Sequence, residues 1–212
     1  PMPDRPEGHY LMMATRDGLI KKTPLDEFAN LRKSGLIAIV LRDEDELIGV
    51  ELTDGSDELI LGTRRGKAIR FSESHVRSMG RASMGVRSIR LEEDDRVIDM
   101  AVVEEGSTIL CISENGYGKR TDPEAYREQG RGGKGIAAMA LTEKTGYMAA
   151  QLAVQSGEDI LLITDDGTVI RTPVDDIRLC GRATQGVRLM RIEEGKRIVG
   201  VARAEAEEEE PA

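Results

Sequence analysis

The chain has 212 residues, of which 39% are hydrophobic and 33% charged, and its formal net charge at pH 7 is −9. This length suits one large domain or two small ones, and the composition excludes low-complexity and collagen-like chains. No apolar run reaches the roughly 18 residues of a membrane-spanning helix, and the first residues show no signal peptide, so we expect a soluble, cytoplasmic protein without a membrane partner.

A fourfold repeat of about 50 residues organises the chain. In residues 12–18, 61–66, 111–116 and 162–167, apolar residues lead into Ser or Thr, two mostly polar residues and glycine. A second glycine follows in each unit, and these are Gly35, Gly85, Gly135 and Gly186. An apolar residue closes each unit, and these are Ile48, Ile98, Met148 and Ile198. Because three landmarks keep one spacing, one structural unit recurs four times.

Each unit is predicted to hold four short strands, as its last copy illustrates. Residues 159–164 form an apolar strand, Asp165-Asp166-Gly167 supplies a tight turn, and residues 168–172 return as a second strand. Residues 186–192 alternate apolar and polar side chains, as a half-buried strand does, and residues 197–202 form the last strand. No segment keeps a helical period, so the sequence predicts an all-β fold.

Units of this size with four strands are typical of propeller blades, which must stack to bury their faces. We therefore predict a propeller-like array with blades at residues 10–53, 56–103, 106–154 and 157–203. Residues 1–9 are predicted to be a linker, and residues 204–212 an acidic, disordered tail with five Glu. The negative total charge therefore describes the tail in part.

Basic residues recur in register with the repeat. A base stands four residues after the first glycine of every unit, and these bases are Lys22, Arg70, Arg120 and Arg171. Lys21 and Lys119 directly precede two of them. Further bases accompany the second glycine, and these are Arg32, Lys33, Arg81, Arg87, Arg131, Lys134, Arg182 and Arg188. Equivalent positions of stacked blades face the same way, so we expect these side chains to form an outer belt.

Such a belt fits duplex DNA held by its phosphates, without reading of the bases. Aromatic residues make up only 3% of the chain, which disfavours base stacking. A single repeat would suggest nothing more than solvated surface charge. The shared register, with the acids in other loops, favours the DNA-binding interpretation.

Three segments carry a resemblance to a known family. They are Gln129-Gly130-Arg131-Gly132-Gly133-Lys134-Gly135, Asn115-Gly116-Tyr117-Gly118-Lys119-Arg120-Thr121 and Thr184-Gln185-Gly186-Val187-Arg188. Together with the period, they resemble the C-terminal domain of DNA gyrase A over residues 10–204. The resemblance implies a six-bladed β-pinwheel, in which blades exchange strands and duplex DNA wraps around a basic rim. The four repeats would then be the last four blades.

The resemblance also implies a non-catalytic module that supports ATP-dependent negative supercoiling. Its partners would be duplex DNA, the rest of gyrase A, and gyrase B, in the cytoplasm and nucleoid of a bacterium. ATP and Mg²⁺ would act elsewhere in that complex, so no cofactor is expected in this chain, which alone would be a monomer. The two cysteines, Cys111 and Cys180, have no metal-binding spacing, and we expect reduced thiols and no metal site.

One departure from the family pattern bears on function. The family's box, Q-R-R-G-G-K-G, belongs to its first blade, whereas the match here lies in the third repeat and has Gly130 in place of Arg. Two alternatives stay open: the equivalent domain of the A protein of topoisomerase IV, which bends DNA without a well-kept box, and a propeller-type scaffold for acidic proteins. Residues 130–135 also match a dinucleotide fingerprint, but they follow no strand and open no helix.

Overall fold

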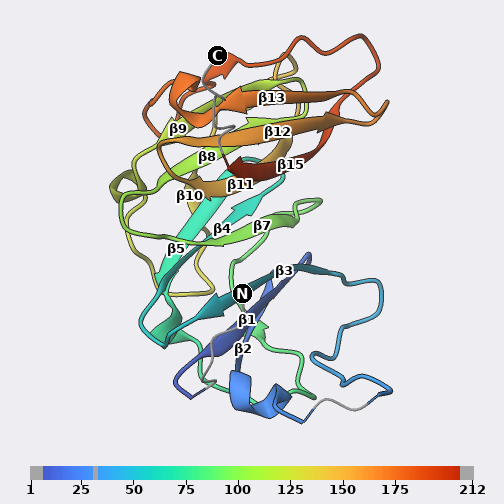
Figure 1. Cartoon of the computed structure of the whole chain (residues 1–212), viewed down its shortest axis with the longest axis vertical. Coiled ribbons are helices and arrows are strands. Elements are labelled where there is room, and N and C mark those ends of the chain that lie inside the picture. The colour runs from blue at the N-terminus through green and yellow to red at the C-terminus, as the bar shows by residue number, and fades with distance from the viewer. Residues whose placement is uncertain (1–6, 31–32, 206–212) are drawn as a thin grey trace, which may run out of the picture. The chain divides into compact units, whose positions relative to one another are not determined.

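Strands and short 3₁₀ helices form the regular structure of residues 7–30 and 33–205, which are the residues that the computed structural model describes (Figure 1). The strands are β1 (Tyr10–Thr15), β2 (Leu19–Pro24), β3 (Leu47–Thr53), β4 (Glu58–Thr63), β5 (Lys67–Ser72), β6 (Val86–Arg87), β7 (Val97–Val102), β8 (Thr108–Ser113), β9 (Tyr117–Thr121), β10 (Ile136–Ala137), β11 (Met148–Val154), β12 (Glu158–Thr164), β13 (Val169–Pro173), β14 (Val187–Arg188) and β15 (Ile198–Glu205). The 3₁₀ helices are η1 (Leu25–Phe28), η2 (Glu73–His75), η3 (Pro123–Ala125) and η4 (Val174–Asp176). The all-β prediction is confirmed. Arg32, residues 1–6 of the linker and residues 206–212 of the tail lie outside the described residues.

The chain divides into two compact units, which are described separately below. Unit 1 contains the described residues up to Thr63 together with residues 68–103 and 127–136. Unit 2 contains residues 64–67, 104–126 and 137–205. Two sheets belong mainly to unit 1, with strand orders β3-β1-β2-β6 and β10-β5-β4-β7. The sheets of unit 2 have the orders β11-β8-β9-β14 and β13-β12-β15.

Within each repeat, a tight hairpin forms the centre of the sheet. The first hairpin pairs β1 with β2, and Gly18 adopts a φ of +82° in its turn. The last strand of the repeat then pairs with the outer side of the hairpin, as β3 does with β1. This antiparallel arrangement follows from the turn chemistry and the alternating side chains seen in the sequence.

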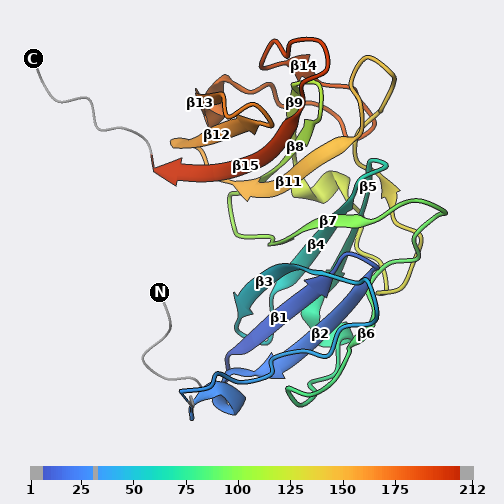
Figure 2. The same cartoon turned by 90° about the vertical axis from the view of Figure 1, so that its right-hand side faces the viewer.

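The outermost strand of a sheet comes from the following repeat. Strand β6 pairs with β2 and places Val86 opposite Ile20, and strand β14 pairs with β9 and places Arg188 opposite Tyr117 (Figure 2). The strand exchange between blades that the resemblance implies is therefore confirmed. Gly85 permits the close approach of β6, because a Cβ atom there would lie 2.5 Å from the carbonyl oxygen of Ile20. Among the described residues, the sheet of the last repeat contains three strands.

Each unit has its own core, which is mostly aliphatic, in keeping with the low aromatic content. In unit 1 the core includes Ile20, Leu61, Ile69 and Phe71. In unit 2 the core includes Leu110, Ile112, Ile160, Leu162 and Val174. Cys111 is buried and Cys180 is partly exposed, and both are free thiols. No helix within the described part of the chain is long and apolar enough to cross a membrane.

Candidate nucleic-acid interface

Two of the predicted belt residues, Lys21 and Lys119, lie inside the protein instead of on its surface. Both are fully buried. The Nζ of Lys119 donates to the carbonyl oxygens of Gly181, at 2.8 Å, and Arg182. The Nζ of Lys21 donates in the same way to the carbonyl oxygens of Ala38, at 2.6 Å, and Arg81. Burial lowers the pKa of both lysines. The expected outward position of these two residues is thus corrected.

The base at the next position of each hairpin is held by polar partners. Lys22 and Arg70 are almost fully buried; Lys22 Nζ lies 2.9 Å from Glu73 Oε2, and Arg70 Nη2 lies 2.5 Å from Glu58 Oε2. Arg120 and Arg171 keep more exposure, although Arg171 Nε lies 2.6 Å from Asp159 Oδ2. Lys22 and Arg70 therefore contribute to packing and present little charge at the surface, which corrects the expected belt.

Strand exchange explains this burial. After η2, η3 and η4, the chain runs alongside the hairpin of the preceding repeat. The N–H of Met79 donates to the carbonyl of Lys22, that of Gln129 to Arg70, and that of Cys180 to Arg120, all at 2.8 to 2.9 Å. In the first three repeats, the strand that carries Lys22, Arg70 or Arg120 is thus flanked by the next repeat.

A second set of predicted belt residues, three arginines, donates side-chain hydrogen bonds to backbone carbonyl groups. Arg131 Nε donates to the carbonyl of His75 at 2.8 Å, and its Nη1 donates to the carbonyl of Arg87 at 3.3 Å. Arg182 makes the equivalent bonds to the carbonyls of Ala125 and Ala137. Arg81 donates to the carbonyl of Ile37 at 3.4 Å. Each of these arginines therefore connects its own repeat to the preceding one.

The box-like motif, Gln129 to Gly135, forms a folded turn in unit 1. Gly132 and Gly135 adopt φ values of +79° and +68°, which glycine tolerates best. Gly132 N–H donates to the carbonyl of Ser88 at 2.6 Å, and Arg90 N–H donates to the carbonyl of Gly133 at 2.7 Å. Arg131 of the motif binds backbone carbonyls, whereas Lys134 is exposed.

The remaining predicted bases are exposed, and others that the prediction omitted accompany them. Lys33, Arg87, Lys134 and Arg188 are exposed. Three arginines that lie two positions after the last residue of η2, η3 and η4 are exposed as well, and so are Arg90 and Arg191; the three are Arg77, Arg127 and Arg178. Arg77, Arg127 and Arg178 are separated by 50 and 51 residues, so the same repeat alignment could have found them.

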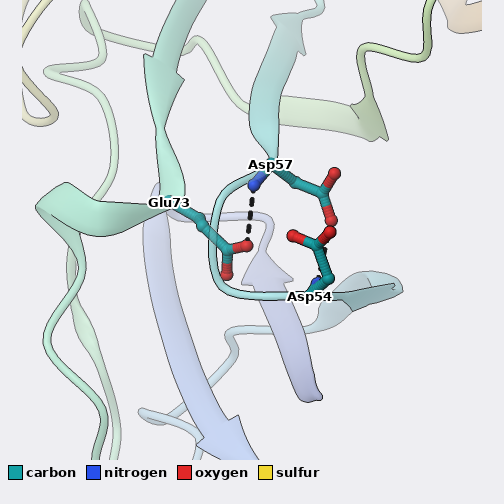
Figure 3. Close-up of side chains that lie close together, drawn as sticks. All are labelled: Asp54, Asp57 and Glu73. Carbon is teal, nitrogen blue, oxygen red and sulfur yellow. Dashed lines mark hydrogen bonds between the residues drawn. The ribbon is translucent and has the colours of Figure 1, made fainter. Parts of the chain in front are cut away.

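An acidic group in unit 1, Asp54, Asp57 and Glu73, is the one described cluster of potential metal ligands (Figure 3). Protein donors already occupy its oxygens. Glu73 Oε1 accepts from the N–H groups of Gly55 and Asp57, at 2.6 and 2.9 Å, and its Oε2 faces Lys22. Burial raises the pKa of Asp57, and hydrogen bonds from Ser56 lower the pKa of Asp54. This geometry stabilises the loop before β4.

Antiparallel sheets completed by strand exchange between successive repeats define the molecule as a β-propeller-like repeat protein. The family model described as "DNA gyrase C-terminal domain, beta-propeller" matches residues 9–54, 57–104, 107–149 and 158–205. The chain belongs to this DNA gyrase C-terminal domain family.

Relatives and solved structures agree with this assignment. The DNA gyrase A protein of Halalkalibacterium halodurans is 58% identical over 99% of the chain, and that of Pseudomonas aeruginosa is 46% identical over 94%. The chain spans 25% and 22% of the lengths of these two proteins. A topoisomerase IV C-terminal domain superimposes with a TM-score of 0.90 at 28% identity, covering 96% of this chain and 64% of that one. A DNA gyrase A C-terminal domain gives a TM-score of 0.84 at 27% identity, covering 93% and 66%.

Proposed function

We propose that this chain is a non-catalytic module of a bacterial type IIA topoisomerase that binds and bends duplex DNA. Within the longer enzyme it would act with the rest of gyrase A and with gyrase B, in the cytoplasm near the nucleoid. There it would support negative supercoiling, while ATP and Mg²⁺ serve other parts of the complex. Family membership supports this proposal, and so does the distribution of exposed bases.

The observation that carries the proposal is the repeated arginine after the 3₁₀ segment. Arg77, Arg127 and Arg178 are exposed, and none of the three side chains has a polar partner among the described residues. Each lies beside a parallel bridge to the preceding hairpin; these bridges join Ser78 to Lys22, Glu128 to Arg70 and Leu179 to Arg120. The backbone is therefore fixed while the guanidinium group stays available for a phosphate.

The same arrangement favours phosphate contact over base reading. The exposed tyrosine of the described residues, Tyr147, has its ring covered by the Arg64 guanidinium at 3.8 Å from the ring centroid. A stacking platform for unpaired bases would need free aromatic faces. Affinity would therefore come from charge, and bending of the duplex would be offset by contacts distributed along the repeats.

Duplex binding measured at several salt concentrations tests the proposal. With about eight phosphate contacts, log K should fall against log[salt] with a slope of about −7. Replacing Arg77, Arg127 and Arg178 by Gln should make the slope shallower by about 3. The matched control replaces Arg65, Arg96 and Arg197, which are exposed arginines in hairpin and strand-joining turns, and should change the slope less.

Binding that is the same at 50 and 200 mM salt would contradict the proposal. Binding of acidic proteins in preference to duplex DNA would favour the scaffold alternative. The gyrase and topoisomerase IV alternatives differ in the full-length enzyme. In a gyrase, the triple Gln variant should lose negative supercoiling and retain relaxation of supercoiled DNA, whereas a topoisomerase IV would show no supercoiling with either form.

A further inference from the structure

Two basic hollows occupy equivalent positions of the repeat, one in each unit. The hollow of unit 1 has a volume of about 520 Å³, and its lining includes Arg42, Arg87 and Arg90. The hollow of unit 2 has a volume of about 650 Å³, and its lining includes Lys144, Arg188 and Arg191. Arg188 and Arg191 follow Arg87 and Arg90 by 101 residues, which is two repeats.

Strand exchange builds both hollows. The exchanged strand β6 sets Arg87 opposite Leu19 of β2, and the exchanged strand β14 sets Arg188 opposite Tyr117 of β9. In the repeat between them, Ala137 and Ala140 occupy the positions of the two arginines. The pair of arginines therefore recurs only in every second repeat, although the strand arrangement recurs in every repeat.

A second feature alternates with the same period. The buried lysines Lys21 and Lys119 belong to the hairpins that border the hollows, whereas the equivalent positions of the second and fourth repeats are Ile69 and Ile170. These other hairpins instead carry the ion pairs Arg70–Glu58 and Arg171–Asp159. The repeats are thus organised in pairs, and the hollows follow that pairing.

The hollows carry more basic than acidic side chains, and several of the arginines have no acidic partner among the described residues. The side chains of Arg42, Arg87, Arg90 and Arg191 form no ion pair with any described residue. The acids in the two linings are Asp17 in unit 1, and Glu193 and Glu194 in unit 2, where Lys196 is a further base. Bases outnumber acids in both hollows, so an anion is the ligand that they favour.

The hollow of unit 2 has one additional donor. The hydroxyl of Tyr117 accepts hydrogen bonds from Arg188 Nε at 3.2 Å and Nη2 at 2.8 Å. Its lone pairs are engaged by these bonds, which leaves its own O–H hydrogen to donate. Leu19 stands at the equivalent position in unit 1 and has no such group.

We propose that each hollow binds a phosphate group of the DNA backbone, and that the unit 2 hollow binds more tightly because Tyr117 adds a donor. This inference rests on the proposed DNA-binding function and makes it specific. The phosphate contacts would recur at every second repeat. They would add to the contacts of the arginines that follow the 3₁₀ segments.

Salt titrations of duplex binding to the full chain test the inference. The pairs Arg87→Gln with Arg90→Gln, and Arg188→Gln with Arg191→Gln, should each make the slope of log K against log[salt] shallower by about 2. Tyr117→Phe should weaken binding several-fold and leave the slope unchanged, because it removes a donor without a charge. Arg96→Gln with Arg197→Gln is the control, since these equivalent, exposed arginines line neither hollow.

Inorganic phosphate provides the second arm. At constant ionic strength, phosphate should displace DNA from the wild-type chain more strongly than chloride does, and this difference should shrink in the two arginine-pair variants. Equal slopes for hollow and control variants, or equal displacement by phosphate in all forms, would overturn the inference. Salt-dependent binding by the wild type would in that case still stand, so the proposed function would survive.

Discussion

The Nζ of Lys22 lies 2.9 Å from Oε2 of Glu73, and the two side chains are 7% and 0% exposed. Lys22 belongs to the first repeat and Glu73 to the second, so a buried ion pair joins two repeats within unit 1. The two partners are unequal. Glu73 also accepts from Thr53 Oγ1 and from the N–H groups of Gly55 and Asp57, whereas Lys22 otherwise faces the ring of Tyr10.

Removing the acid should therefore cost more than removing the base. Glu73→Leu leaves a buried ammonium group and several donors without partners, and we expect a loss of about 3 to 5 kcal/mol in the free energy of unfolding. Lys22→Met leaves Glu73 with its other donors and should cost less. Urea denaturation of the two variants measures the difference, and equal losses would contradict the asymmetry.

Two equivalent glycines should respond differently to alanine. Gly35 and Gly85 have φ values of +76° and +93°, so alanine at either position carries a backbone cost of about 1 to 2 kcal/mol. Only Gly85 faces backbone, because a Cβ atom there would lie 2.5 Å from the carbonyl oxygen of Ile20, whereas Gly35 has nothing within 4 Å. Thermal melting should show a clearly larger loss for Gly85→Ala. Similar losses would mean that β6 does not need this close approach.

Lys119 should make stability depend on pH. Its pKa is lowered, first by burial and also by Arg182, from the ordinary 10.5. Between the two pKa values the unfolded chain binds more protons, so stability rises with pH and levels off above 10.5. Lys119→Ile, which copies Ile170, removes this dependence. Denaturation across that range should show the wild type gaining on the variant as the pH rises, and a constant difference would contradict the assignment.

The two bases of the box-like motif should have different roles: Arg131 should support stability, and Lys134 should support DNA binding. Arg131→Ala removes hydrogen bonds to the carbonyls of His75 and Arg87, and we expect a loss of stability of about 1 to 3 kcal/mol. Lys134→Ala should leave stability unchanged and make the DNA-binding salt slope shallower by about 1. Arg182→Ala removes the equivalent hydrogen bonds in unit 2 and should cause a similar loss of stability. A stability loss for Lys134→Ala would mean that it has a structural role.

Much of the fold could be predicted from the sequence, because the repeat, its hairpin glycines and its alternating strands are local features. The burial of Lys21 and Lys119 is not local. Nothing in the two strands alone indicates it, and some of the carbonyl oxygens around the two ammonium groups, those of Arg81 and Gly181, come from the following repeat. Arg77, Arg127 and Arg178 keep the period of the repeat, but they follow the 3₁₀ segments and lie away from the glycines that mark each unit.

Strand exchange also sets the order in which the molecule can be completed during synthesis. Strand β2 ends at Pro24, but the strand that completes its sheet, β6, begins at Val86. The first sheet therefore stays open at that side until most of the second repeat has left the ribosome, and β9 waits in the same way for β14. The hairpin of one repeat thus provides the pairing edge for a strand of the next repeat, and one sheet is completed only while the next sheet is forming.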